Sequence, residues 1–334
     1  MRRICIFVIL VVLASPIFCQ PVLQKIGTYK CGKQPKQVIF TPDNKQIILP
    51  LLDEDGFDIF DIEQKKIIKR ISPPQSKKVG FAEGLFIPQK NAFFVSQMTT
   101  AKIYEYSYPG FVYRREISTG GEWSKFIAYS PQKNLIAVSN WISNDVSFID
   151  YATGKLLGLC ATSAAPRGLA FIEDGKELIS LAFDGGVIEK IDTQTRTIVK
   201  SLSKPKAAMR HIVTDSTSTW AYISDMYNRS IYKLNLKTFE ITSSVKVFNN
   251  PNTIELLDDS YLFVSSRGPN NTEDYTKRSP QNGKIQLIST ADMTITLEFE
   301  GGNQPTGLDI SSDGKLLCFS NFQDNTIELY SITP

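Results

Sequence analysis

A pattern of short apolar strands joined by polar turns recurs along this chain, and no other feature restricts the possible fold as much. Residues 136–158 read IAVSNWISNDVSFIDYATGKLLG, which is two alternating runs around a polar corner, followed by a Thr-Gly-Lys turn. Residues 165–202 and 304–333 share this plan. Copies begin near seven positions: Pro35, Ala82, Trp123, Pro166, Met209, Pro251 and Pro305. The period is therefore 41 to 54 residues.

Seven copies of about four short strands predict an all-β fold, a seven-bladed β-propeller with four-stranded antiparallel blades. A lone four-stranded sheet cannot bury both faces, so it must stack against neighbours in a ring. The innermost strands, for example GLAF and GLDI, are apolar with little alternation, as expected where both faces of a sheet are covered. Residues 20–334 should form this single domain.

Closure of the ring is predicted from the two ends of the repeat array. The last copy contains three strands, and residues 22–31 (VLQKIGTYKC) supply an unassigned strand before the first copy. We expect the N-terminal strand to complete the last blade, because closure removes sheet edges that would otherwise pair with other chains.

Residues 1–19 read as a secretory signal peptide, which predicts an exported protein in the periplasm, at the cell surface or outside the cell. Arg2 and Arg3 precede an apolar run that is too short to span a bilayer, which needs about 20 residues. Cleavage after Cys19 is the favoured interpretation. An uncleaved anchor and a lipoprotein attached through Cys19 remain alternatives, the latter opposed by the bulky Phe18. We expect no transmembrane span in the mature chain.

Charge and cysteine content exclude some classes of protein. Basic residues exceed acidic ones by 3, and two of these are Arg2 and Arg3 in the predicted leader, so a nucleic-acid partner is not expected. Cys31, Cys160 and Cys318 are an odd number without a close pair or a histidine cluster, so we predict buried thiols and no zinc site. An oxidising compartment leaves a disulfide open as the alternative.

The repeats resemble a known family. AVSNWISNDVSFIDYATGK and CFSNFQDNTIELYSI are similar to the YVTN-type β-propeller repeat, with its Val-Thr/Ser-Asn corner, Asn-Thr-Val strand and Asp-x-x-Thr-Gly-Lys turn. The resemblance covers residues 22–334 and is clearest in the third and seventh copies. It implies a propeller and an exported protein, but no single activity.

Alignment of the copies predicts which residues share one end of the ring. The residues that begin the inner strands are Lys36, Glu83, Ser124, Arg167, Arg210, Asn252 and Thr306, and Lys125 and His211 follow two of them. Converging charges at the mouth of a channel favour an anionic ligand. Alternatively, Arg167 and Arg210 pair with Glu83, Asp225 or backbone carbonyls and hold the blades together, and His211 is a hydrogen-bonded residue of the rim.

A second set of positions follows the second strand of each copy. The corner residues are Leu51, Gln97, Asn140, Ala182, Asp225, Ser266 and Asn321. The next residues are Leu52, Met98, Trp141, Phe183, Met226, Arg267 and Phe322. With Trp123 they predict either an exposed apolar rim that binds a partner or a set of side chains packed on neighbouring loops.

The sixth copy departs from the others by a long insertion, the loop 266–283, where the sequence between Ser266 and Ile285 reads RGPNNTEDYTKRSPQNGK. Such insertions are often binding loops, and disorder is the alternative. Glu273 and Asp274 make calcium conceivable, but the alternation of acidic residues typical of calcium loops is missing, so no cofactor or metal is predicted.

The sequence favours a monomeric, non-catalytic binding module for an anionic small molecule or a protein partner. Its candidate site residues are Lys36, Glu83, Trp123, Trp141, Arg167, Arg210, His211, Asp225 and Arg267. Catalytic motifs are absent and there is one histidine. The first alternative is an enzyme similar to seven-bladed lactonases, in which Arg167 and Arg210 hold a carboxylate and His211 or Glu83 moves a proton. A scaffold of the cell envelope is the second alternative.

Overall fold

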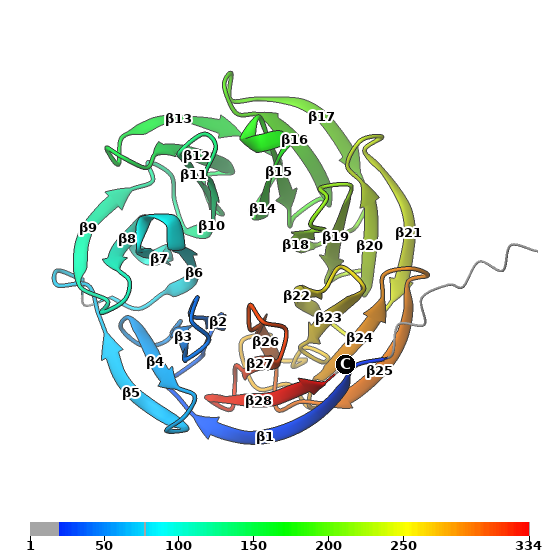
Figure 1. The fold of residues 1–334 in the computed structure, drawn as a ribbon. Helices are drawn as coiled ribbons and strands as arrows, with labels where there is room; N and C mark the ends of the chain where they lie inside the picture. Colours follow the sequence, from blue (N-terminus) through cyan, green and yellow to red (C-terminus); the bar gives the residue numbers. More distant parts are fainter. Residues whose placement is uncertain (1–19, 77, 334) are drawn as a thin grey trace, which may run out of the picture.

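The computed structural model describes residues 20–76 and 78–333, which form a ring of seven four-stranded antiparallel sheets around a central axis (Figure 1). The predicted leader and Cys19 lie outside the described residues. The predicted fold class is confirmed, because each sheet runs outward from an inner strand in chain order, except the last.

The blades contain 28 strands in the described part of the chain. Blades one and two comprise β2 (Ile39–Phe40), β3 (Gln46–Pro50), β4 (Phe57–Asp61), β5 (Lys66–Ile71), β6 (Phe81–Ile87), β7 (Ala92–Gln97), β8 (Lys102–Ser107) and β9 (Tyr113–Ser118). Blades three and four comprise β10 (Ser124–Ser130), β11 (Leu135–Asn140), β12 (Asp145–Asp150), β13 (Leu156–Ala161), β14 (Pro166–Ile172), β15 (Glu177–Ala182), β16 (Val187–Asp192) and β17 (Thr197–Ser203).

Blades five to seven follow the same plan. Their strands are β18 (Met209–Thr214), β19 (Trp220–Asp225), β20 (Ser230–Asn235), β21 (Glu240–Lys246), β22 (Pro251–Leu257), β23 (Tyr261–Ser266), β24 (Lys284–Ser289), β25 (Thr294–Glu300), β26 (Pro305–Ile310), β27 (Leu316–Asn321) and β28 (Thr326–Thr333), with β1 (Val22–Lys30). Helical structure in residues 20–76 and 78–333 is confined to three short 3₁₀ turns: η1 (Pro88–Lys90), η2 (Met98–Thr100) and η3 (Glu173–Gly175). None of the helices in this part is long and apolar enough to cross a bilayer.

The hydrophobic core is divided into seven layers, one between each pair of neighbouring blades. Between blades one and two, for example, Phe57 packs edge-on against Phe93 and Tyr106, with ring centroids 5.2 Å apart in both pairs. Another layer joins blade seven to blade one through Cys318, Ile327 and residues of β3. No blade has a core of its own, so the ring must close for every layer to be buried.

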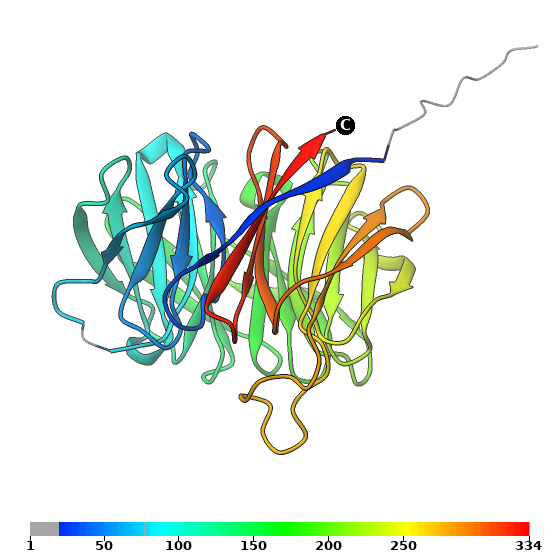
Figure 2. The ribbon, with the colours of Figure 1, turned by 90° about the horizontal axis from the view of Figure 1, so that it is seen from below.

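The N-terminal strand closes the ring as predicted. β1 pairs antiparallel with β28, from Val22 opposite Thr333 to Lys30 opposite Thr326, and becomes the outermost strand of blade seven (Figures 1 and 2). Leu23 and Tyr29 of this strand pack on the layers on either side of the last blade. The first and last strands of the described chain are thus held together by main-chain hydrogen bonds.

The register of two blades differs from the sequence alignment by one residue. The residues opposite the corner positions are Pro35, Phe81, Ser124, Pro166, Met209, Pro251 and Pro305. The residue that follows the paired one is therefore Ala82 in blade two and Lys125 in blade three. The sequence alignment assigned this position to Glu83 and Ser124, and that prediction was wrong. Because side chains alternate along a strand, a slip of one residue changes the direction in which each one points.

Of the three cysteines in the described residues, Cys160 and Cys318 are buried, Cys31 is partly buried, and all three thiols are free. Burial raises the pKa of Cys160 to about 11. These thiols are therefore held in the protonated form at neutral pH.

Candidate functional site

A pocket of about 740 Å³ opens at the end of the ring where the inner strands begin. A volume in this range suits a small organic ligand. Five of its six basic residues form what we call the basic cluster, which is Lys36, Lys125, Arg167, Arg210 and Arg267. Three of its five aromatic residues form what we call the aromatic wall, which is Trp123, Trp141 and Phe183. The lining also includes Asp184, Lys206, Met226, Tyr227, Asn250, Asn252, Asn270 and Tyr275.

The structure brings six of the nine candidate site residues into this pocket. They are Lys36, Trp123, Trp141, Arg167, Arg210 and Arg267. Glu83, His211 and Asp225 do not line it.

Four members of the basic cluster occupy equivalent positions in different blades. Lys36, Lys125, Arg167 and Arg210 each follow the first paired residue of their inner strand, and Asn252 does so in blade six. Because equivalent positions in a propeller repeat around the axis, these side chains converge on the mouth of the channel.

Serine hydroxyls join neighbouring blades at this level. Ser139 Oγ donates to the carbonyl of Arg167 at 2.9 Å and accepts from the backbone N–H of Phe126 at 3.1 Å. Ser96 and Ser224 likewise donate to the carbonyls of Lys125 and Asn252, at 2.6 and 2.7 Å. Each serine precedes a corner residue, so this position of the repeat fixes the backbone from which the pocket residues project.

Arg167 is the most enclosed member of the basic cluster, at 1% exposure, and Glu83 is its ionic partner. The pair links blade two to blade four, which agrees with the alternative in which Arg167 pairs with Glu83 and holds the blades together. Nη2 of Arg167 donates to Glu83 Oε1, whereas Nη1 is buried without a partner in the described residues.

Two further polar groups of the pocket lack partners. Asn252 is 1% exposed, and neither its amide nitrogen nor its amide oxygen is hydrogen-bonded within the described chain. The side chain of Arg210, at 6% exposure, forms no hydrogen bond or ion pair in residues 20–76 and 78–333, so the alternative in which it pairs with Glu83 or Asp225 was wrong. Buried polar groups are normally satisfied, so unpaired ones that line a pocket indicate a place for ligand atoms.

The pKa values of three members of the basic cluster, Lys36, Lys125 and Arg267, are lowered by burial, and those of the two lysines also by repulsion from neighbouring charges. Burial, then the charges of Arg267, Arg167 and Lys125, hold the pKa of Lys36 well below its usual range. Burial and Arg167 do the same for the pKa of Lys125, and burial lowers the pKa of Arg267 to about 10. A bound anion would reduce the repulsion among these groups.

The aromatic wall stands beside the basic cluster. The rings of Trp141 and Phe183 lie 4.8 Å apart between centroids, and the ammonium group of Lys125 lies 3.5 Å from the Trp141 ring centroid. Trp141 and Phe183 are partly buried. These two side chains therefore lie between the two predicted arrangements, an exposed apolar rim and a set of side chains packed on neighbouring loops. Phe322 is buried beneath Lys36 and Arg267, which lie 5.1 and 5.5 Å from its ring centroid.

The two candidate proton carriers lie one residue further along their inner strands than the basic cluster. Glu83 is engaged by Arg167. His211 is 8% exposed, contacts the ring of Phe126 at 5.4 Å between centroids and has no partner at Nδ1 in the described residues. Burial and the charge of Arg167 lower the pKa of His211 to about 3, so the imidazole is neutral at pH 7.

Asp225 stabilises the corner of blade five. Its carboxylate accepts from the backbone N–H of Ala208 at 2.8 Å, from the Asn228 amide at 2.8 Å and from the Tyr232 hydroxyl at 2.7 Å. Asn140 accepts from the Ser124 hydroxyl and donates to Asp145 in blade three, and Asn321 accepts from the Gly302 N–H and donates to Glu328 in blade seven. The side chains at the corner position therefore stabilise the fold in blades three, five and seven.

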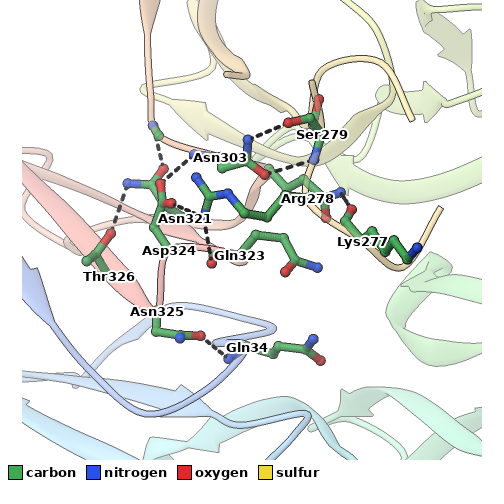
Figure 3. A network of polar contacts seen from close by, with 12 residues as sticks. Gln34, Lys277, Arg278, Ser279, Asn303, Asn321, Gln323, Asp324, Asn325 and Thr326 are labelled. Atoms are coloured by element: carbon green, nitrogen blue, oxygen red, sulfur yellow. Dashed lines mark hydrogen bonds and ion pairs between the residues drawn. The ribbon is translucent and has the colours of Figure 1, made fainter. Parts of the chain in front are cut away.

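The insertion of blade six is an ordered loop that projects from one face of the ring, opposite the C-terminus (Figure 2). Arg278 binds Asp324 at 2.6 Å and the carbonyl of Gln323 at 3.0 Å, and Ser279 and Asn303 exchange two hydrogen bonds of 3.0 Å (Figure 3). These contacts hold the loop on blade seven while Asn270 and Tyr275 reach the pocket.

The described residues contain no group of three or more His, Cys, Asp or Glu side chains that could hold a metal ion. Glu273 and Asp274 instead bond within the loop, to Lys277 at 2.9 Å and to Thr276 at 2.7 Å.

Four residues of the pocket, Lys125, Phe183, Met226 and Asn252, were absent from the site predicted from the sequence, although each belonged to an aligned position. Lys125 was misplaced by the one-residue slip, since the structure pairs the corner residue Asn140 with Ser124 and not with Trp123. Asn252 and Phe183 occupy the same repeat positions as Arg167 and Trp141. Tyr275 and Asn270 lie outside the repeat, so no alignment could place them.

Comparison with known proteins gives a related sequence and a structural likeness. No protein-family model matches the chain. Antigen Lp49 of Leptospira interrogans serogroup Icterohaemorrhagiae serovar copenhageni (strain Fiocruz L1-130) is 38% identical over 316 residues, which are 91% of this chain and 69% of that protein. A chain of Kuenenia stuttgartiensis hydrazine synthase superposes with a TM-score of 0.75 at 14% identity, covering 89% of this chain and 95% of that one. This likeness concerns the fold alone.

Proposed function

This chain belongs to the family of Antigen Lp49, and from that premise we propose that it is an exported, non-catalytic β-propeller that binds a small anionic ligand in the basic pocket. The predicted leader at residues 1–19 and the relative's name as an antigen support export. The serines that precede the corner residues, such as Ser139, support our further proposal that the blades are YVTN-type repeats.

One observation carries the binding proposal: the Asn252 amide is buried in the pocket without a hydrogen-bond partner in the described chain, and the Arg210 side chain lines the same pocket without a hydrogen bond or ion pair to a described residue. Arginine presents several donors in a planar fork suited to carboxylates and phosphates. Only Asp184 among the lining residues is acidic, and it is exposed. The pocket thus offers donors and positive charge without an internal acceptor for Arg210.

Binding is favoured over turnover by the positions of the candidate proton carriers. Glu83 is held by Arg167, and His211 does not line the pocket. His211→Ala should therefore leave ligand affinity within about threefold of wild type. A ligand that is chemically converted by the wild type and left intact by His211→Ala would support the lactonase-like alternative instead.

The test is a thermal-unfolding series of residues 20–334 in inorganic phosphate at constant ionic strength. A ligand that binds only the folded state adds about 2.7 kcal/mol at a hundredfold excess over its Kd. We expect phosphate to raise the Tm of wild type and of the surface control Lys237→Gln, and to have little effect on Arg210→Gln. An equal rise in all three proteins would place the anion elsewhere and refute the proposal.

A further inference from the structure

The unpaired guanidinium groups around the pocket indicate the least negative charge that a ligand should bring. Arg167 is already paired with Glu83. Arg210 has no partner in the described chain, and Arg267 donates to the neutral side chain of Gln304, while its Nε is buried and unpaired. Two guanidinium groups therefore lack a carboxylate within the described residues. A buried charge is costly without a counter-charge, so a dianion suits the pocket better than a monoanion.

The other side of the pocket offers aromatic and apolar surface beside the Lys125 ammonium group. Trp141 and Phe183 form a tilted aromatic pair, and Met226 lies in the lining with them. Trp123, which is 45% exposed, flanks the same opening. Large flat side chains that stay partly exposed at a pocket provide area for an apolar group of a ligand.

We propose that the pocket recognises an organic dianion that carries a flat apolar ring, with the charged end on Arg210, Arg267 and Asn252 and the ring against Trp141 and Phe183. This proposal rests on the function proposed above and specifies its ligand class. An aryl phosphate and an aromatic dicarboxylate both have this chemistry. Inorganic phosphate has the charge alone, and phenol has the ring alone.

The test is calorimetric titration of residues 20–334 with phenyl phosphate, phthalate, inorganic phosphate and phenol at pH 7.5. We expect at least one of the two aryl dianions to bind about tenfold or more tightly than inorganic phosphate, because the ring leaves water. Phenol should bind too weakly to measure. Whichever aryl dianion binds more tightly identifies the head group.

Variants separate the two halves of the site. Phe183→Leu should weaken the preferred aryl dianion about fivefold and leave inorganic phosphate unchanged, whereas Arg210→Gln should weaken both. Val112→Ala, at an exposed position that does not line the pocket, is the control and should match wild type. Circular dichroism melting of each variant checks that the fold is kept.

The outcomes distinguish this inference from the function beneath it. Equal affinity for inorganic phosphate and both aryl dianions, or measurable binding of phenol that survives Arg210→Gln, would overturn the two-part ligand and leave the anion site standing. Failure of all four compounds to bind would overturn both proposals.

Discussion

Removal of the carboxylate that neutralises Arg167 tests whether the pocket concentrates positive charge. In Glu83→Gln the Arg167 guanidinium stays buried, at 1% exposure, with its counter-charge lost. Breaking a buried ion pair by changing one partner typically costs about 3–5 kcal/mol, because the remaining charge is left unpaired in a low-dielectric site. We expect a loss of this size in the free energy of unfolding, measured by urea denaturation without added anions.

The double variant Glu83→Gln with Arg167→Gln is the matched control, since it removes both charges and keeps two polar side chains of similar length. It should recover more than half of the loss. The single variant should also bind phosphate more tightly than wild type, because one more uncompensated positive charge then faces the pocket. A single variant within about 1 kcal/mol of wild type, or a double variant no more stable than the single one, would refute this reasoning.

Three other predictions follow from the fold and from the pKa values. Deletion of residues 20–33 removes the closing strand and should lower the Tm by about 5 °C or more in a thermal melt; an unchanged Tm would show that the ring does not depend on this strand. Burial raises the pKa values of Glu255 and Asp309, so the free energy of unfolding of the wild type should fall as pH rises from about 4 through the raised pKa values of these two carboxyl groups. Glu255→Gln lacks one of these groups, so it should be more stable relative to wild type at pH 8 than it is at pH 5. A stability difference between variant and wild type that is the same at both pH values would contradict this. The lowered pKa values of Lys36 and Lys125 should rise when an anion binds, so these lysines should take up protons on binding. Calorimetric titration with phenyl phosphate at pH 8.5 should therefore give a binding heat that depends on the ionisation enthalpy of the buffer. The same heat in every buffer would contradict this prediction.

The architecture was predictable from the sequence because a propeller repeats one local pattern. Strand length, turn residues and the apolar inner strands recur in every copy, and the closing strand follows from the incomplete last copy. Ser139 and its equivalents show why the pattern is kept, since each one bonds to its own inner strand and to the next blade.

The site was predictable only where equivalent positions carry unusual residues. Arg167 and Arg210 were placed correctly because their blades align without ambiguity. The slip that hid Lys125 arose in blade three, where the residue that pairs with the corner is Ser124 and not Trp123. A jump in pairing follows the equivalent residue in blades two to seven, so this irregularity is a feature of the repeat and does not single out blade three. Partners were harder to predict than positions. Glu83 reaches Arg167 from two blades away, and Tyr275 reaches the pocket from a loop whose path depends on tertiary contacts such as Arg278 with Asp324.

The most direct test of the anion site is anomalous diffraction from crystals soaked in selenate, a dianion whose selenium atom can be located without assumptions about the surrounding structure. We predict a selenium peak in the pocket within hydrogen-bonding distance of Arg210 and Asn252, and no such peak in crystals of Arg210→Gln. Selenate bound only on other surfaces, with the pocket of the wild type empty of it, would contradict the proposed site.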